Sequence, residues 1–232
     1  MPEHTYKQYD AELENIRTRV LQMGGLVEQQ IIRAMEGLTS GDMTLIEDVI
    51  RNDNRVNLHE VELDEQCSQI IGKRQPVAGD LRIIMTVIKT ITDLERIGDE
   101  AKKIAKMARY IHEDTGAVVP RIELRHAANL AVEMLRRALD AFARLDVSAA
   151  ADVVRQDKEV DAEFKSVMRQ LITFMMEDPR TISRGLNVLF VAKSIERIGD
   201  HAKNMSEYVV YMVKGRDVRH ISLEEMEREV AS

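Results

Sequence analysis

The chain has 232 residues, a formal net charge of −7 and an apolar fraction of 44%. Only 4% of its residues are aromatic, and with 11 Gly and 4 Pro the composition argues against β-sandwiches, barrels and disordered chains. The acidic balance gives no reason to expect nucleic-acid binding. One cysteine and no signal peptide or spanning apolar run lead us to expect a cytoplasmic protein that meets membranes only peripherally, through partners.

Apolar residues recur at helical spacing through most of the chain, and strand-like alternation is missing. Prolines and polar turns divide this pattern into six helices, expected at 5–38, 43–73, 78–112, 121–144, 148–176 and 180–213. The short connections predict that neighbouring helices run antiparallel. A weakly held short helix is expected over 223–230.

The chain also repeats itself. Residues 95–99, Glu-Arg-Ile-Gly-Asp, recur as residues 196–200, which is an offset of 101. Upstream, an offset of 104 pairs Arg33 with Arg137 and Asp53 with Asp157. Such self-similarity predicts an all-α fold of two tandem, pseudo-symmetric three-helix bundles. We expect the first repeat at 1–116, the second at 117–216 and a charged C-terminal tail at 217–232.

Acidic stripes mark both halves of the repeat. Glu95 and Asp99 lie one turn apart on the same helix face, as do Glu196 and Asp200. Further acids interrupt the inward-facing apolar pattern of the preceding helices, where a carboxylate is costly unless a cation or donor meets it. Oxygen ligands of this kind suit hard cations. The candidate metal ligands are Asp53, Asn57, Glu60, Glu95, Asp99, Asp157, Asp161, Glu196 and Asp200.

A second interpretation of the acids stays open, in which they form surface ion pairs with basic residues of the repeats. The basic residues in question are Arg96, Lys102, Arg197 and Lys203. Surface pairs contribute only about 0 to 1 kcal/mol each, which makes them a weak reason for such close identity between the halves. His59 and His201 adjoin the acidic stripes, but adjacency on a helix points them about 100° away.

Two glycines lie inside predicted helices, although glycine costs about 1 kcal/mol there relative to alanine. Because Gly98 and Gly199 are equivalent in the repeat, we expect a neighbouring helix to approach each of them closely. Cys67 lies on an apolar face and is predicted to be a core residue. The nucleotide-binding and hydrolase motifs that we sought are missing, so we do not expect an enzyme.

Three segments together resemble a known family. They are residues 73–82, Lys-Arg-Gln-Pro-Val-Ala-Gly-Asp-Leu-Arg, residues 93–99, Asp-Leu-Glu-Arg-Ile-Gly-Asp, and residues 194–200, Ser-Ile-Glu-Arg-Ile-Gly-Asp. This combination closely resembles the PhoU phosphate-uptake regulators of bacteria, and the resemblance covers nearly the whole chain, duplication included.

The resemblance implies metal binding through Glu/Asp-x-x-x-Asp pairs, with Mg, Mn, Zn or Fe as the expected ions. Glu95 with Asp99 and Glu196 with Asp200 match such pairs, as do Asp157 and Asp161 on the preceding helix. The first half departs from the pattern at Asn57, so its site is expected to carry less negative charge than the second.

The resemblance also implies a regulatory function. Family members couple the phosphate ABC transporter, through its ATPase, to a sensor histidine kinase and repress the phosphate-starvation response when phosphate is plentiful. A homodimer is expected, with Arg74 and Arg82 near the loop before the third helix as candidate interface residues. Two alternatives stay open: a carboxylate-rich metal-binding or metal-storage bundle, and a purely structural helical module.

Overall fold

The computed structural model describes residues 7–113 and 122–231, and every regular element in them is helical. The helices are α1 Lys7–Ser40, α2 Met43–Arg74, α3 Ala78–Glu113, α4 Arg125–Arg144, α5 Val147–Glu177, α6 Ile182–Lys214 and α7 Leu223–Ala231. A short 3-10 turn, Pro179–Thr181, precedes α6. The all-α prediction is confirmed.

The expected start of the first helix at residue 5 lies outside the described residues, and two other predicted helix starts differ from the structure by two or more residues. The fourth helix begins at Arg125, four residues later than expected, and residue 121 itself lies outside the described residues. The sixth helix begins at Ile182, after the 3-10 turn. In that turn the Asp178 carboxylate accepts a hydrogen bond from the backbone N–H of Arg180, which holds the chain in a tighter conformation before α6.

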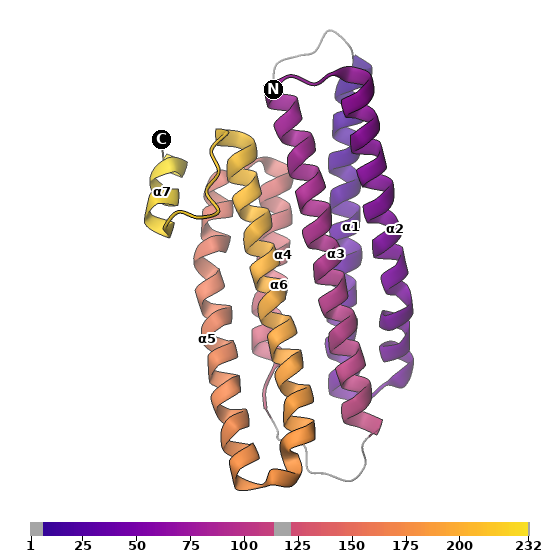
Figure 1. Cartoon of the computed structure of the whole chain (residues 1–232), viewed down its shortest axis with the longest axis vertical. Helices are drawn as coiled ribbons and strands as arrows, with labels where there is room; N and C mark the ends of the chain where they lie inside the picture. The colour runs from indigo at the N-terminus through magenta and orange to yellow at the C-terminus, as the bar shows by residue number, and fades with distance from the viewer. Residues whose placement is uncertain (1–6, 114–121, 232) are drawn as a thin grey trace.

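The helices form two three-helix bundles that lie side by side (Figure 1). One consists of α1, α2 and α3, and the other of α4, α5 and α6. The central helices α3 and α6 pack against each other, while α1 also contacts α4. Aliphatic side chains of both bundles form one continuous core. The predicted pair of pseudo-symmetric bundles is therefore confirmed, with α3 and α6 as the main boundary between them.

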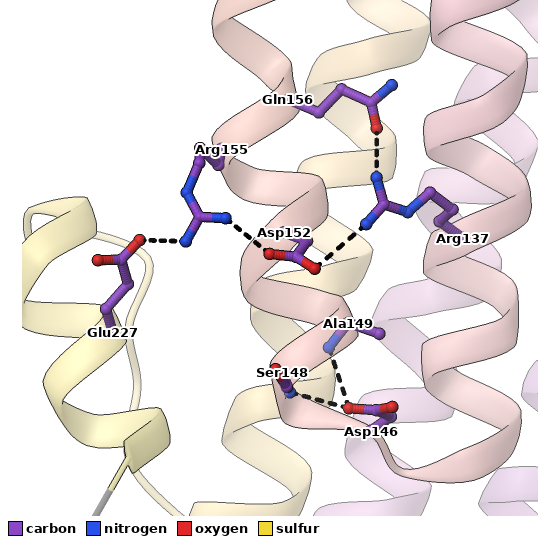
Figure 2. Close-up of polar contacts among 8 residues, drawn as sticks. All are labelled: Arg137, Asp146, Ser148, Ala149, Asp152, Arg155, Gln156 and Glu227. Atoms are coloured by element: carbon purple, nitrogen blue, oxygen red, sulfur yellow. Dashed lines mark hydrogen bonds and ion pairs between the residues drawn. The ribbon is translucent and has the colours of Figure 1, made fainter.

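The corner between the first two helices of each bundle is built in the same way. Asp42 and Asp146 cap α2 and α5, and each carboxylate accepts hydrogen bonds from two backbone N–H groups of the following turn. Figure 2 shows the cap of Asp146 with Ser148 and Ala149. The residue before each cap has a left-handed backbone, with φ of 72° at Gly41 and 57° at Leu145.

Close helix approach at the two repeated glycines is confirmed. A Cβ atom placed on Gly98 would lie 3.2 Å from Val56 Cγ1, and one on Gly199 would lie 3.4 Å from Val160 Cγ1. Val56 and Val160 are themselves equivalent in the repeat. The glycines therefore let the third helix of each bundle pack tightly against the second.

The C-terminal helix α7 lies against α5 (Figure 1). Met226 of α7 is buried, as is Val218 in the segment that leads to it. Ser222 and Glu225 form a capping box, in which each side chain accepts a hydrogen bond from the other's backbone N–H. The expected short helix is thus present, and it is seated on the second bundle. None of the helices in the described part of the chain has the length and apolar character needed to cross a membrane.

Candidate functional site

A buried aspartate of the first bundle is paired with a lysine from α3. Asp53 lies among the inward-facing apolar residues of α2 and is only 1% exposed. Lys102 Nζ donates a hydrogen bond to Asp53 Oδ2 over 2.6 Å and lies 3.9 Å from Asp99 Oδ1. The hydrogen bond to Asp53 raises the pKa of Lys102. The ammonium group therefore compensates the charge of a carboxylate that would otherwise be costly to bury.

The second bundle repeats this pair. Lys203 Nζ donates to Asp157 Oδ2 over 2.9 Å, and both residues are the repeats of Lys102 and Asp53. Burial of Lys203 is the largest single influence and opposes its charged form, but the hydrogen bond to Asp157 and the negative charges of Asp157, Glu207 and Asp200 together outweigh it, so the pKa is raised. The alternative interpretation of the sequence, in which lysines neutralise the acids, describes these two contacts correctly, except that the aspartates are buried.

Other predicted site residues of the first bundle lie close enough to change one another's pKa values. Burial, followed by the charges of Asp99, Glu60 and Asp53, raises the pKa of Glu95. Burial is also the main cause of the raised pKa of Glu60. The two acidic stripes of α2 and α3 thus face each other, as the sequence predicts, and their carboxylates repel one another.

The acidic stripes of α5 and α6 meet in the same way. Burial and then the charges of Glu196 and Asp157 raise the pKa of Asp200 to about 6, and Asp161 adds to this effect. Glu196 accepts a hydrogen bond from Lys193 Nζ over 2.7 Å. Asp161 lies at the edge of the cluster, 4.0 Å from Lys165 Nζ.

These donors suit a hard cation in their chemistry, but the described side chains do not converge on one point. In the part of the chain that the structure describes, Asp53 Oδ1 and Asn57 Oδ1 are buried with no hydrogen-bond partner, and coordination to a cation would satisfy both oxygens. Within residues 7–113 and 122–231, however, no three His, Cys, Asp or Glu side chains converge closely enough to hold a metal ion. In each bundle the buried aspartate instead forms an ion pair with a lysine ammonium group.

Neither histidine forms a hydrogen bond to a predicted metal ligand in the described chain. His201 Nδ1 lies 2.6 Å from Asp93 Oδ1 on α3, across the boundary between the bundles. Nearby, Ser194 Oγ donates to Glu100 Oε2 over 2.8 Å. Sequence reasoning missed these boundary contacts, although a signal was present: Asp93 and Glu100 are polar residues on helix faces that are otherwise apolar. His59 Nδ1 is buried and has no hydrogen-bond partner in the described chain.

Both predicted interface arginines contact their own chain. The Arg74 guanidinium donates two hydrogen bonds to Glu12, over 3.0 and 2.7 Å. The guanidinium carbon of Arg82 lies against Gly215 at the end of α6, 3.5 Å from the position that a Cβ would take there. Their role in partner binding stays a prediction.

Comparison with known proteins matches both halves of the chain. The PhoU domain family matches residues 20–108 and again residues 124–209, one copy in each bundle. The phosphate-specific transport system accessory protein PhoU homolog of Pseudomonas aeruginosa is 47% identical, over 98% of this chain and 94% of its own. The accessory protein PhoU of Escherichia coli is 46% identical with the same coverage.

Two crystal structures share the fold. PhoU from Pseudomonas aeruginosa matches with a TM-score of 0.86 at 46% identity, covering 90% of this chain and 100% of that one. The phosphate transport system regulatory protein PhoU from Streptococcus pneumoniae matches with a TM-score of 0.83 at 26% identity, covering 90% and 99%. Because the similarity extends through both bundles at this level of identity, the chain belongs to the PhoU family.

Proposed function

We propose that this protein is an accessory protein of phosphate-specific transport that acts by binding and not by catalysis. The observation that carries the proposal is the 47% identity to a transport accessory protein over 98% of the chain. Similarity of that extent includes both bundles, so it covers the whole of the architecture and not one domain alone. The solved relative from Streptococcus pneumoniae bears the name of a regulatory protein, which favours regulation over transport itself.

The finer proposal is an adaptor role. The protein would couple the ATPase of the phosphate ABC transporter to a sensor histidine kinase on the cytoplasmic side and repress the phosphate-starvation response when phosphate is plentiful. Two bundles of the same fold lie side by side, which suits an adaptor with two partners. A homodimer is part of this proposal.

The decisive experiment is deletion of the gene in the source bacterium, followed by its restoration. Alkaline phosphatase activity is measured in phosphate-replete medium, together with phosphate uptake. We expect high phosphatase activity in the deletion strain and a return to low activity on restoration. Normal phosphatase activity with unchanged uptake in the deletion strain would overturn the proposed function.

Charge reversal tests the loop before α3 as the partner interface. Arg82→Glu and Arg74→Glu are expected to weaken association with the transporter ATPase or the kinase in a pull-down. Because Arg74→Glu also breaks the contact with Glu12, Glu12→Gln serves as the matched control, which loses the same ion pair without reversing the charge. Unchanged association of both arginine variants would contradict this interface.

Metal binding by the acidic clusters is a second candidate, favoured by the buried oxygens Asp53 Oδ1 and Asn57 Oδ1, which have no hydrogen-bond partner in the described chain. Elemental analysis of the untagged protein tests it, with the Glu196→Ala/Asp200→Ala variant as control. A stoichiometric divalent ion or iron that is lost in the variant would support a metal site. Absence of metal from both proteins would remove the metal site and leave the adaptor proposal intact.

A further inference from the structure

In the second bundle, a chain of charged side chains holds α7 in place (Figure 2). Arg137 of α4 and Arg155 of α5 both donate to Asp152, over 3.4 and 2.7 Å. We call these two arginines and the aspartate between them the charged triad of the second bundle. The other end of the Arg155 guanidinium donates to Glu227 of α7. One arginine therefore bridges an aspartate of its own bundle and a glutamate of the helix that docks on it.

The first bundle contains the same triad. Arg33 of α1 donates to Asp48 of α2 over 3.1 Å, and Arg51 donates to the other oxygen of Asp48. These residues precede their counterparts by 104 positions. The side chain of Arg51 is 72% exposed, and its ion pair in the described structure is with Asp48. The position that Glu227 occupies in the second bundle therefore has no acidic counterpart in the described part of the first.

No helix of the described chain covers the face beside Arg51. In the second bundle Ala151 and Val154 of α5 are buried, and α7 packs against this helix. Their counterparts on α2 are the exposed Glu47, which is paired with Arg109, and the half-buried Ile50. Within the described residues, α2 packs only against α1 and α3.

Exposed apolar side chains lie on both sides of Arg51 along this face. Met43 is partly exposed one turn before Glu47, and Leu58 is 62% exposed two turns after Arg51. We name this surface the α2 outer face and define it by Met43, Ile50, Arg51 and Leu58.

The helix that fills the equivalent place in the second bundle shows which chemistry such a surface accepts. Helix α7 contains four glutamates and one arginine. One side of α7 is partly or fully buried and combines apolar residues with the glutamate that binds Arg155. This side consists of Leu223, Met226, Glu227 and Val230. Helix α7 is an acidic amphipathic helix.

We propose that the α2 outer face is a docking surface for an acidic amphipathic helix of a partner protein. A glutamate of that helix binds Arg51, and its apolar side covers Met43, Ile50 and Leu58. Two observations carry the assignment: the charge complementarity at Arg51, and the occupied copy of the same triad in the second bundle. The assignment goes beyond the proposed transport function and does not depend on it.

The test uses the full-length protein with a synthetic peptide of residues 220–232, which reproduces the chemistry of α7. The protein is labelled with ¹³C at its methionine methyl groups, and the peptide is added at millimolar concentration because so short a helix is only marginally stable when free. We expect the NMR signal of Met43 to shift. Met176, which is exposed at the far end of α5, provides an internal control that stays unchanged.

Two variants separate specific docking from general attraction between charges. Arg51→Glu is expected to weaken binding, read from the Met43 shift, at least fivefold. Arg144→Glu is the matched control: Arg144 has the same 72% exposure and a similar ion pair to an aspartate of its own helix, so binding should be unchanged. A peptide carrying Glu227→Gln should bind as weakly to the unaltered protein as the original peptide binds to Arg51→Glu.

Four results would overturn the assignment. The first is a Met43 signal that does not move, and the second is a shift that is equal in Arg51→Glu and Arg144→Glu. The third is a shift of the protein's own Met226 in place of Met43, since the peptide would then be displacing α7 from α5. If Met43 shifts with protein concentration alone and Arg51→Glu abolishes that shift, the occupant is a second copy of this chain, which also overturns the assignment to a partner protein.

Discussion

Asp93 and His201 hold the two bundles together from inside, with 2.6 Å between Asp93 Oδ1 and His201 Nδ1 and both side chains buried. The counterpart of Asp93 in the repeat is Ser194, and the counterpart of His201 is Glu100. These counterparts also contact each other, over 2.8 Å. The pseudo-twofold relationship thus places a buried polar contact on each side of its axis, made by different side chains.

Removal of Asp93 is expected to destabilise the fold strongly. Asp93→Ala leaves a buried imidazole nitrogen without its partner, which should lower the free energy of unfolding by about 2 to 4 kcal/mol. Denaturant unfolding measures this, and His201→Ala with the double variant completes a cycle. We expect a coupling energy above about 1 kcal/mol. Additive effects of the two substitutions would show that the contact contributes nothing of its own.

The two repeated glycines should respond differently to alanine. At Gly199 the new methyl group meets Val160 at ordinary contact distance, so the gain in helix propensity should stabilise the protein by up to about 1 kcal/mol. At Gly98 the distance to Val56 is shorter, so Val56 must move and the gain should be lost. Thermal unfolding of the two variants gives the comparison. Greater stability of Gly98→Ala than of Gly199→Ala would contradict the packing described.

Glu207 should make stability depend on pH in the neutral range. Burial raises its pKa to about 7, from 4.5. The folded state then binds this proton more tightly than the unfolded state does, so the unfolding free energy falls as pH rises from about 4.5 to 7. Glu207→Gln removes the effect and should stabilise the protein at pH 8 by about 1 to 3 kcal/mol, with no gain near pH 4. An equal gain at both pH values would show that the carboxylate charge is not the cause.

Cys67 should be unreactive in the folded protein. Its thiol is fully buried between apolar residues of α2, and this burial, together with the charge of Asp64, raises its pKa to about 12. The thiolate that reacts with disulfide reagents is therefore scarce at pH 8. We expect no labelling by Ellman's reagent until guanidinium unfolds the chain, and then one equivalent. Rapid labelling under native conditions would contradict the burial of this residue.

Much of the fold could be predicted because its signals are local or repeated. Helical periodicity gives the six long helices, and polar cap residues such as Asp42 and Asp146 give the starts of α2 and α5 to within one residue. The start of α4 was harder, because Leu124 before it makes no side-chain cap. At α6, the 3-10 turn depends on how Asp178 folds back on Arg180, which periodicity does not report.

The candidate site was predictable only in part, for the same physical reason. Helix geometry predicts that the acidic stripes of neighbouring helices face each other. The charges of acids on the neighbouring helix contribute to the raised pKa values of Glu95 and Asp200, as this arrangement requires. Which cation meets the buried Asp53 depends on the rotation of α3 relative to α2, and this is set by packing of the whole bundle. The contact between Asp93 and His201 joins residues 108 positions apart, and nothing local pairs them.

The left-handed backbone at Leu145 has a consequence for how the two halves can exchange sequence. Its counterpart Gly41 adopts the same backbone without a Cβ, whereas a leucine there carries a conformational strain of roughly 1 kcal/mol. The Leu145 side chain packs against the core, and that contact offsets the strain. The first corner therefore relies on a residue that bends freely, and the second on a side chain that anchors it. A fragment transplanted from one half into the other would bring a corner matched to the wrong core.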